Sequence, residues 1–252
     1  PFDIKEVRQA IAYGINKQQI LDAIFYGEGE VAYGPYRKAD WAYNPDIEYS
    51  YDPEKSKQLL KDAGFVDSDG DGILEKDGKK LEFDLIYPSS NAERKDIAIA
   101  SKSDLEKIGI NLNPVGKSWD EIDYNYLHSN AFAYSWGTAF DPDDINYKLW
   151  NSQFIDQGWW NPATYSNPEV DKLLNEGRTT SDKDKRKDIY GQIQKYLADD
   201  EPVVFIVFSN YIYAFSDKIS GIEPRNGPHG YGSNGALTGE LWWNIDKWDV
   251  KE

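Results

Sequence analysis

The sequence has no cysteine and no methionine, and it has only two histidines, His128 and His229. Without cysteine there are no disulfides, no thiolate zinc sites and no cysteine nucleophiles. The two histidines lie far apart in the sequence and no Gly-x-Ser-x-Gly motif is present, so neither a zinc hydrolase nor a serine hydrolase is predicted. Because the sequence starts at Pro1 without a methionine or a leader, we expect a fragment or a processed chain.

Basic residues are scarce as well. The 28 Lys and Arg residues stand against 44 Asp and Glu residues, which gives a formal net charge of -16. Such a field repels phosphate backbones and anionic lipid surfaces, so binding to nucleic acid is not expected. No run approaches the roughly 18 apolar residues of a membrane-spanning helix. The 252 residues are enough for one large globular domain or two small ones.

Aromatic residues are abundant, with nine Trp, eighteen Tyr and ten Phe. This number exceeds what a core of this size needs, and such a surplus often lines a ligand cleft. A carbohydrate platform and a peptide groove would both use it.

Strand and helix patterns alternate through the middle of the chain. Alternating strands and helices are typical of a parallel sheet with helices packed on its faces. The predicted fold is therefore α/β, a doubly wound lobe with a mostly parallel sheet. The predicted order is strand 81–87, helix 91–108, strand 110–115, helix 118–129 and a strand from residue 131 onward.

The later part of the chain continues with helices and then strands. Asn167 is predicted to start a short helix that ends at Gly177, and Ser181 is predicted to cap a longer one. Residues 203–208 are apolar at every position, which is typical of a strand buried on both faces. Residues 211–215 alternate and are predicted to form a neighbouring strand.

Two segments have no regular period. Residues 28–50 form an aromatic, proline-bearing arm that includes Tyr33, and an aperiodic stretch of this length is usually functional or held on a surface. Residues 221–252 are rich in glycine and aromatics, and such a tail rarely packs on itself alone. We therefore divide the chain into a lobe, residues 1–220, and a C-terminal tail, residues 221–252.

The segment 131–150 ends a predicted strand and starts a helix. Phe132, Tyr134 and Trp136 alternate with small residues, the pattern stops at Gly137, and Asp141 can cap a short helix after the loop. Ligands of open α/β sheets bind at such strand ends. A ligand-binding loop and an ordinary buried core strand both remain open on this spacing.

Residues 67–78 form an acidic loop, and its first half matches that of a calcium-binding loop. Asp67, Asp69 and Asp71 alternate with small residues and Glu75 stands at the ninth position. The twelfth position, which needs a bidentate glutamate, is Gly78. We therefore predict a turn with weak calcium binding at most, and no other cofactor.

The residues alone do not exclude one class of enzyme, the glycoside hydrolases. A glycoside hydrolase needs only two carboxylates at a set separation, and nothing among the acidic residues singles out a pair. No phosphate-binding loop or dinucleotide fingerprint is present.

Three motifs in the same order resemble those of a known family. They are EVRQAIAYGINKQQILDAIFYGEGEVAYGP, AGFVDSDGDGILEKDGKKLEF and SWGTAFDPDD. Together they resemble the solute-binding proteins of bacterial ABC importers in the peptide and nickel class, extracellular solute-binding protein family 5. The resemblance covers nearly the whole chain. It implies a periplasmic-binding-protein-like fold of type II, cluster C.

The resemblance also implies the setting of the chain. Proteins of this family have two lobes, catalyse no reaction, deliver a solute to ABC permease subunits in the membrane and are exported. They are lipid-anchored on the outer face of the cell membrane or lie in the periplasm. This chain would supply the C-terminal lobe and a tail that returns to the N-terminal lobe, which the sequence does not contain.

The resemblance implies a ligand-binding set on the loop after the strand. Trp136 and Phe140 fall on pocket-lining positions, and Gly137 and Thr138 offer backbone groups. The full predicted set adds Tyr134, Asp141 and Tyr33.

Two departures from the family bear on the ligand. Dipeptide-binding relatives carry an aspartate where this chain has Ala139, and nickel-binding relatives carry a histidine that is missing between Pro142 and Pro202. An oligopeptide is the leading expectation, and a metal chelate or an oligosaccharide is the alternative.

Overall fold

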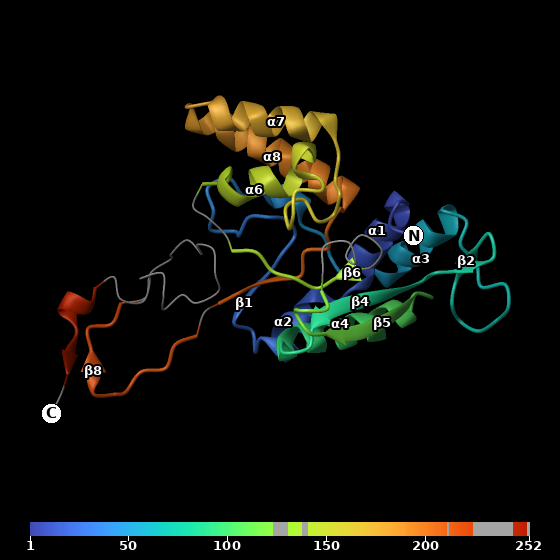
Figure 1. The fold of residues 1–252 in the computed structure, drawn as a ribbon, viewed down its shortest axis with the longest axis horizontal. Coiled ribbons are helices and arrows are strands. Elements are labelled where there is room, and N and C mark those ends of the chain that lie inside the picture. The colour runs from blue at the N-terminus through green and yellow to red at the C-terminus, as the bar shows by residue number, and fades with distance from the viewer. Residues whose placement is uncertain (123–130, 138–140, 211, 224–243, 251–252) are drawn as a thin grey trace.

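A parallel three-stranded sheet stands at the centre of one half of the molecule. The computed structural model describes residues 1–122, 131–137, 141–210, 212–223 and 244–250. Strand β4 (Glu82–Pro88) is the middle strand, with β5 (Asn111–Lys117) on one side and β6 (Ala131–Phe132) on the other. Both neighbours run parallel to β4 (Figure 1). The expectation of an α/β fold with a parallel sheet is confirmed.

Four helices pack with this sheet. They are α1 (Lys5–Gly14), α2 (Lys17–Ile24), α3 (Pro53–Asp62) and α4 (Ala92–Glu106). Leu60, Leu81 and Leu105 are almost fully buried in the cluster that joins the helices to the strands. No helix in the described ranges is long and apolar enough to cross a membrane.

Local hydrogen bonds start three of these helices where the sequence predicts. The side chain of Asn16 accepts from the Gln19 N–H, that of Asp52 from the Lys55 N–H, and that of Asn91 from the Arg94 N–H, at 3.0, 2.9 and 2.8 Å respectively. Each cap satisfies a backbone donor that the first helical turn leaves free.

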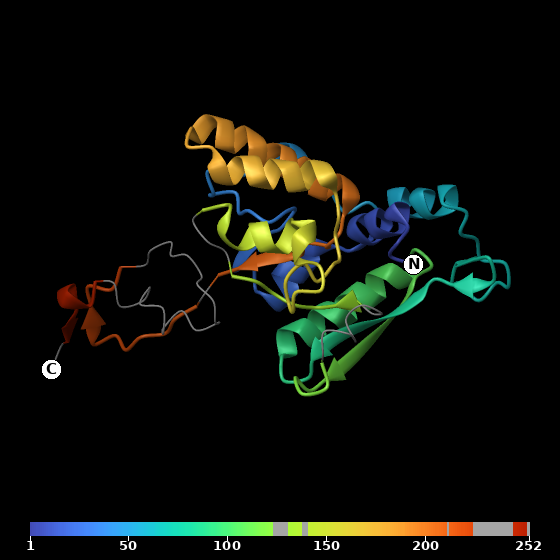
Figure 2. The same cartoon turned by 45° about the horizontal axis from the view of Figure 1, so that its top comes forward.

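A second half consists mainly of helices. It contains α6 (Asp144–Trp150), α7 (Pro168–Thr179), α8 (Lys183–Asp200) and the short 3-10 turns η1 (Pro45–Ile47) and η2 (Ser152–Phe154). Tyr190, Leu174 and Ile193 are fully buried in its own core cluster. Figure 2 shows α7 and α8 above the sheet.

Two helix boundaries differ from the prediction. Gly177 does not end α7, which continues to Thr179, because Gly177 faces the ring of Tyr190 and only a residue without Cβ fits there. The cap of α8 is Asp182 instead of Ser181, since the Asp182 carboxylate accepts from two backbone N–H groups of the first turn.

The predicted strand 203–208 is wrong in extent. Only β7 (Val207–Ser209) is a strand, and it pairs antiparallel with β1 (Gly29–Val31). Gly29 permits this pairing, because a Cβ there would lie 2.3 Å from the Phe208 carbonyl oxygen. No strand forms in the described part of the predicted neighbour, residues 212–215.

Residues 203–206, which precede β7, are apolar although they form no strand, because they contact a core on each side. Val203 and Phe205 pack on the helical cluster, whereas Val204 and Ile206 pack on the cluster of the sheet half. Every residue of the run is therefore half-buried against one of two cores, because the chain passes between them.

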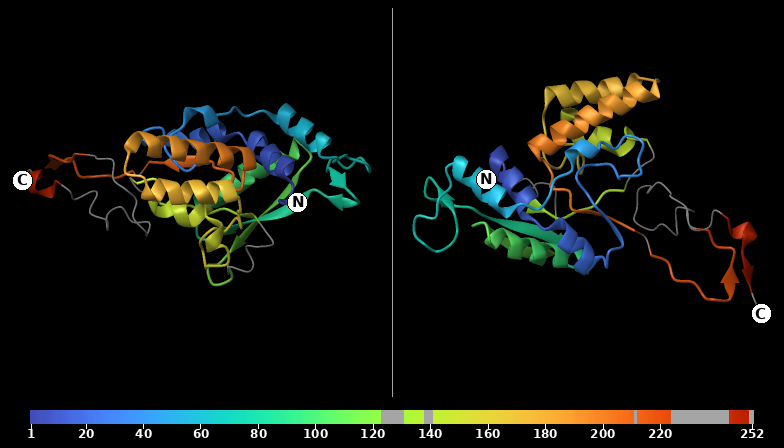
Figure 3. Two further views of the ribbon diagram at one scale, coloured as in Figure 1. Left: turned by 90° about the horizontal axis from the view of Figure 1, so that it is seen from above. Right: turned by 180° about the vertical axis from the view of Figure 1, so that it is seen from behind.

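The remaining strands of the described ranges form two small antiparallel pairs. Strand β2 (Glu75–Lys76) forms a hairpin with β3 (Lys79–Lys80). Strand β8 (Ile219–Ser220) pairs with β9 (Asp249–Val250), which follows the 3-10 turn η3 (Ile245–Lys247). The pair of β8 and β9 lies at one end of the molecule, away from the two cores (Figure 3). A return of the tail to another lobe stays a prediction.

Candidate ligand-binding site

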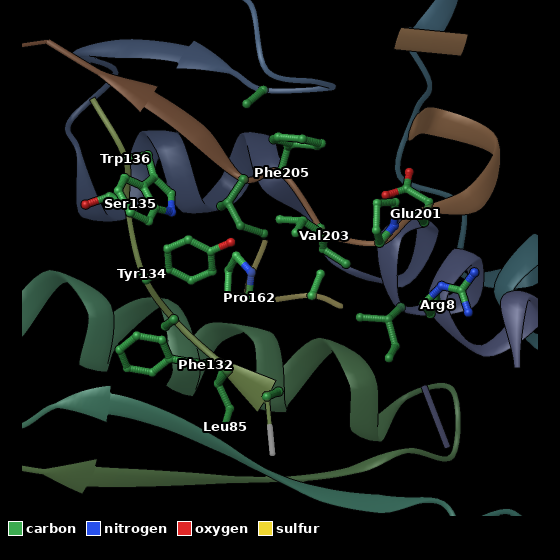
Figure 4. Close-up of a pocket in the computed structure, with 18 of the residues that line it drawn as sticks. Arg8, Leu85, Phe132, Tyr134, Ser135, Trp136, Pro162, Glu201, Val203 and Phe205 are labelled. Atoms are coloured by element: carbon green, nitrogen blue, oxygen red, sulfur yellow. The ribbon is translucent and has the colours of Figure 1, made fainter. Parts of the chain in front are cut away.

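A cavity of about 1390 Å³ lies between the two halves. The sheet half contributes Leu85 and Phe132 to its lining, and the run before β7 contributes Val203 and Phe205. Figure 4 shows these side chains around the space, with Arg8 and Glu201 toward its other end. The walls are mainly apolar, as in most sites for small ligands.

An aromatic strip follows the segment that leaves β6. The rings of Phe132 and Tyr134 stack with centroids 5.8 Å apart, and those of Tyr134 and Trp136 meet edge to face at 6.2 Å. Trp136 stacks in turn on Trp160, at 5.1 Å and an interplanar angle of 17°. The alternation of an extended chain places these three side chains in sequence along the cavity (Figure 4). The strip is defined as Phe132, Tyr134, Trp136 and Trp160.

The strip also presents polar groups. Burial raises the pKa of Tyr134 above its ordinary value, so its hydroxyl stays protonated. The indole N–H of Trp136 is buried and has no hydrogen-bond partner of normal geometry among the described residues. The Trp136 N–H interacts with the Tyr134 oxygen, so the Tyr134 hydroxyl proton is the donor available at the cavity wall.

The backbone beyond β6 is open. The Ala133 N–H donates to the Ile86 carbonyl at 2.8 Å and continues the pairing of β6 with β4. After this bond, residues 134–137 form no backbone–backbone hydrogen bond with the part of the chain that the structure describes. Within the described ranges, a stretch whose backbone N–H and C=O groups are unpaired therefore runs along the strip.

The predicted site residues fall into three groups. Tyr134, Trp136 and Gly137 line the cavity together. Thr138 and Phe140 lie outside the described residues. Tyr33 and Asp141 are described and do not line this cavity.

Asp141 is held by α8. Its carboxylate accepts two hydrogen bonds from Arg186, at 3.0 and 2.8 Å, and this contact lowers the pKa of Asp141 below its ordinary value. Asp141 also accepts from the Asp143 N–H. The prediction that Asp141 caps the helix is wrong, because α6 starts at Asp144, two residues later than that cap would require. The structure therefore gives Asp141 a role in holding the loop, and contact with a ligand stays a prediction.

Tyr33 lies in a buried polar cluster of the arm. Its ring meets that of Tyr49 at 5.4 Å, and the Lys17 ammonium lies 5.5 Å from the Tyr33 centroid. Burial lowers the pKa of Lys17 and raises that of Glu201, which also borders the cavity. A role of Tyr33 in ligand binding stays a prediction.

Several lining residues were not predicted. Val203 and Phe205 belong to the run that the sequence assigned to a sheet, and Pro162 and Ala163 lie in an aperiodic segment. The adjacent pair Trp159 and Trp160 was the signal that could have placed this segment at the site, since two tryptophans in a row rarely both serve a core.

The acidic loop makes a turn. It connects Val66 to Glu75, which form a bridge, and Asp67 accepts from the N–H groups of Gly70 and Gly72. The second turn, between β2 and β3, has Asp77 and Gly78 at φ 52° and 72°. Gly78 therefore serves the hairpin, which explains why the twelfth calcium position lacks a carboxylate.

A lysine side chain pairs with two carboxylates of this loop. One oxygen from each of Asp67, Asp69 and Asp71 lies within 4.8 Å of the others. The Lys80 ammonium pairs with Asp69 at 3.1 Å and with Asp71, and these bonds raise its pKa. The Glu75 carboxylate accepts a hydrogen bond from the Ser68 N–H at 2.9 Å. Weak calcium binding stays a prediction.

The fold and the cavity are those of a ligand-binding α/β lobe. Residues 1–158 match the family described as bacterial extracellular solute-binding proteins, family 5 middle. The chain belongs to this family.

Relatives of the chain include binding proteins for several solutes. It is 34% identical over 229 residues to the oligopeptide-binding protein AppA of Bacillus subtilis, covering 88% of this chain and 42% of AppA. It is 33% identical over 240 residues to the heme-binding protein A of Haemophilus influenzae, covering 92% of this chain and 41% of that protein.

Two solved structures resemble the lobe. One is AppA of Bacillus subtilis in complex with a nonapeptide, with a TM-score of 0.81, 31% identity and coverage of 100% of this chain and 48% of that one. The other is NikZ of Campylobacter jejuni in complex with Ni(L-His), with a TM-score of 0.80, 30% identity and coverage of 98% and 49%. The chain thus spans about half the length of the relatives it matches.

Proposed function

We propose that this chain is the ligand-binding lobe of the substrate-binding component of an ABC importer, and that it captures an oligopeptide without catalysing a reaction. The observation that carries the proposal is the open backbone of residues 134–137 beside the aromatic strip. The relative in complex with a nonapeptide, AppA, supports it as well.

The chemistry of the strip suits a peptide. An extended peptide offers one N–H and one C=O per residue, which match the unpaired groups of an extended protein segment. The apolar rings beside that backbone can accept peptide side chains of varied sequence, because burial of apolar surface is not directional. Such a site binds by main-chain contacts and discriminates weakly among side chains.

A nickel chelate is the competing ligand, because NikZ, 30% identical, is in complex with Ni(L-His). No histidine stands among the described residues that line the cavity. Imidazole is the commonest side-chain ligand for nickel, so the described lining favours a peptide. An oligosaccharide would stack on the same rings and is the second competitor.

The proposal extends to the setting of the whole protein. It would be exported, anchored by a lipid or held in the periplasm, and it would deliver its ligand to ABC permease subunits. A second lobe would close the cavity and exclude water from the bound ligand.

The test uses the full-length protein and calorimetric titration with a nonapeptide, with Ni(L-His) and with mannohexaose. We expect binding of the nonapeptide, and a loss of affinity of about 10-fold or more in Trp136→Ala, since a large buried ring contributes well over 1 kcal/mol. Tyr196→Ala, on the exposed face of α8, is the control and should bind normally. Binding of only the chelate or the sugar would contradict the peptide assignment.

A further inference from the structure

The segment that connects α6 to α7, residues 151–167, supplies one wall of the cavity. Its residues 162–167 belong to the lining, and Figure 4 shows Pro162 among the side chains that face the space. Trp160 is not part of the described lining and stacks on Trp136, which is. The two ring centroids are 5.1 Å apart and the ring planes differ by 17°. One face of the Trp136 ring is therefore covered by this segment, and a ligand can contact only the remainder of the ring.

Asn161 is completely buried and holds the segment through its side-chain amide. Its Nδ2 donates to the Asn151 carbonyl at 3.2 Å and to the Tyr165 carbonyl at 2.8 Å. Its Oδ1 accepts from the Tyr165 N–H at 2.9 Å. The amide thus spends both donors and its acceptor on backbone groups from the two ends of the segment, which closes it into a compact loop.

The backbone of this loop is strained at three residues other than glycine. Asp156, Asn161 and Thr164 have φ angles of 61°, 41° and 50°. Aspartate and asparagine tolerate this left-handed region, whereas a β-branched residue such as threonine seldom adopts it. Such conformations persist where the surrounding contacts over-determine them, and they are frequent at ligand sites. Thr164 lies in the cavity lining, so the strain is located in the wall itself.

Contacts with the helical core fix both ends of the loop. The Ser152 N–H donates to the Asp171 carboxylate of α7 at 2.8 Å. The Tyr165 hydroxyl donates to the Asp200 carboxylate at the end of α8 at 2.6 Å. The loop is therefore anchored to two helices and is a firm support for the tryptophan ring that it carries.

We propose that Asn161 is a positioning residue of the ligand site: it fixes Trp160 against Trp136, so that the Trp136 ring is held in its binding orientation before the ligand arrives. This inference rests on the proposed function and adds how the aromatic strip is preorganised. A ring that is already held loses no rotational freedom on binding. Asn161 and Trp160 therefore contribute to affinity although neither belongs to the described lining.

The first experiment measures the stack by circular dichroism of the full-length protein. Two stacked indoles couple their transitions, so the spectra of Trp136→Phe, Trp160→Phe and the double variant should differ from wild type in a non-additive way. We expect this non-additive part in ligand-free protein, and we expect it to persist when a nonapeptide saturates the site. It should disappear in an Asn161→Gly background. A signal that arises only with the peptide would overturn the preorganisation.

The second experiment titrates the same peptide by calorimetry. Asn161→Gly permits the positive φ and removes the amide, and it should lower affinity by about 2- to 10-fold, the cost of ordering one large side chain on binding. Trp160→Leu removes the ring without touching the amide and should lose as much, whereas Trp160→Phe keeps a ring and should retain most of the affinity. Gln157→Ala removes an exposed amide of the same loop and is the matched control.

A double-mutant cycle separates positioning from a general effect on the fold. If Asn161 acts through Trp136, Asn161→Gly should cost no further affinity in a Trp136→Ala background. An equal loss in both backgrounds would overturn the positioning role.

The outcomes also separate this inference from the proposed function. If Asn161→Gly and Trp160→Leu bind the peptide as the wild type does, the importer function stands and the positioning role is wrong. If the wild type binds no peptide, the proposed function fails. In that case a ligand-free dichroism signal that Asn161→Gly abolishes still supports the positioning of Trp136 by Asn161, and a missing signal overturns it.

Discussion

Arg186 of α8 holds Asp141 by two hydrogen bonds, Nη1 to Oδ2 at 3.0 Å and Nη2 to Oδ1 at 2.8 Å. Asp141 follows the loop after Trp136, and Arg186 also donates to the Gly177 carbonyl at the end of α7. The contact therefore fixes the far end of the loop to the helical core, at a residue that the ligand cavity does not include.

Removing this contact should affect the site as well as the fold. The Arg186 side chain is only 18% exposed and also donates to the Gly177 carbonyl, so Arg186→Gln is expected to cost about 1 to 3 kcal/mol of unfolding free energy. Peptide affinity of the full-length protein should fall several-fold, because the loop loses its anchor. Lys195→Gln removes a more exposed pair with Asp46 and is the matched control. Equal affinities in the two variants would contradict the role given to Arg186.

Lowering the pH should weaken the contact between Asp141 and Arg186. The pKa of Asp141 is lowered, chiefly by its hydrogen bonds with Arg186, so the contribution to stability is present above the ordinary value of about 3.9. It is lost as the pH falls through the lowered value. The difference in unfolding free energy between wild type and Arg186→Gln should therefore shrink below about pH 4, as measured by denaturant titration at several pH values.

The buried charges Lys17 and Glu201 should depend on each other. Both are about 95% buried, with 5% and 4% of their surface exposed, and Lys17 also donates to the Tyr49 hydroxyl. Lys17→Met alone leaves buried Glu201 with Arg8 as its remaining positive neighbour and is expected to cost about 3 kcal/mol. The double variant Lys17→Met, Glu201→Gln should recover part of that loss. Additive costs in denaturant unfolding would show that the two groups do not interact.

The same pair predicts a minimum of stability near neutral pH. Burial raises the pKa of Glu201 to about 7, so the folded protein holds more protons than the unfolded chain below that value, and stability falls as the pH rises from about 4.5 to 7. Burial lowers the pKa of Lys17 to about 8, so stability rises again between about 8 and 10.5. Unfolding free energies measured at about pH 5, 7.5 and 10 test whether stability is lowest near neutral pH. In the double variant the unfolding free energy should depend less on pH.

Lys80 should compete with calcium at the acidic loop. We expect calorimetric titration of the wild-type chain with calcium to show no site near the sensor range of about 10⁻⁷ M. Lys80→Met frees Asp69 and Asp71 and should raise calcium affinity, whereas Lys79→Met on the same hairpin should not. Tight binding by the wild type, or equal affinities in both variants, would contradict this account.

Two glycines of neighbouring helices should respond with opposite signs to alanine. A Cβ on Gly177 would lie 2.9 Å from the Tyr190 ring, so Gly177→Ala is expected to destabilise by about 1 to 3 kcal/mol. A Cβ on Gly191 would meet nothing closer than 3.8 Å, so Gly191→Ala should stabilise by about 0.5 to 1 kcal/mol through helix propensity. Thermal unfolding compares them directly, and a stabilising Gly177→Ala would overturn the packing argument.

The sequence by itself determined the helix starts at Asn16, Asp52 and Asn91 and the alternation of β4, α4 and β5. Each cap is a contact between a side chain and an N–H three residues away, so the information is local. The motifs around the acidic loop and Trp136 also determined the family, because they keep their order and spacing whatever surrounds them.

Tertiary structure alone decided which of these residues meet. Arg94 contacts Ser135 across 41 positions and Arg186 contacts Asp141 across 45, and no local pattern indicates either pair. The run 203–206 contacts a core on each side, as its apolar pattern predicts, but its pattern could not show that these cores lie in two different halves and that no described strand pairs with it. The sequence pattern predicted a helix end at Gly177, whereas this glycine lies within α7 and packs against the ring of Tyr190. In each case the deciding contact comes from a part of the chain that only packing brings close, and packing depends on shape in three dimensions.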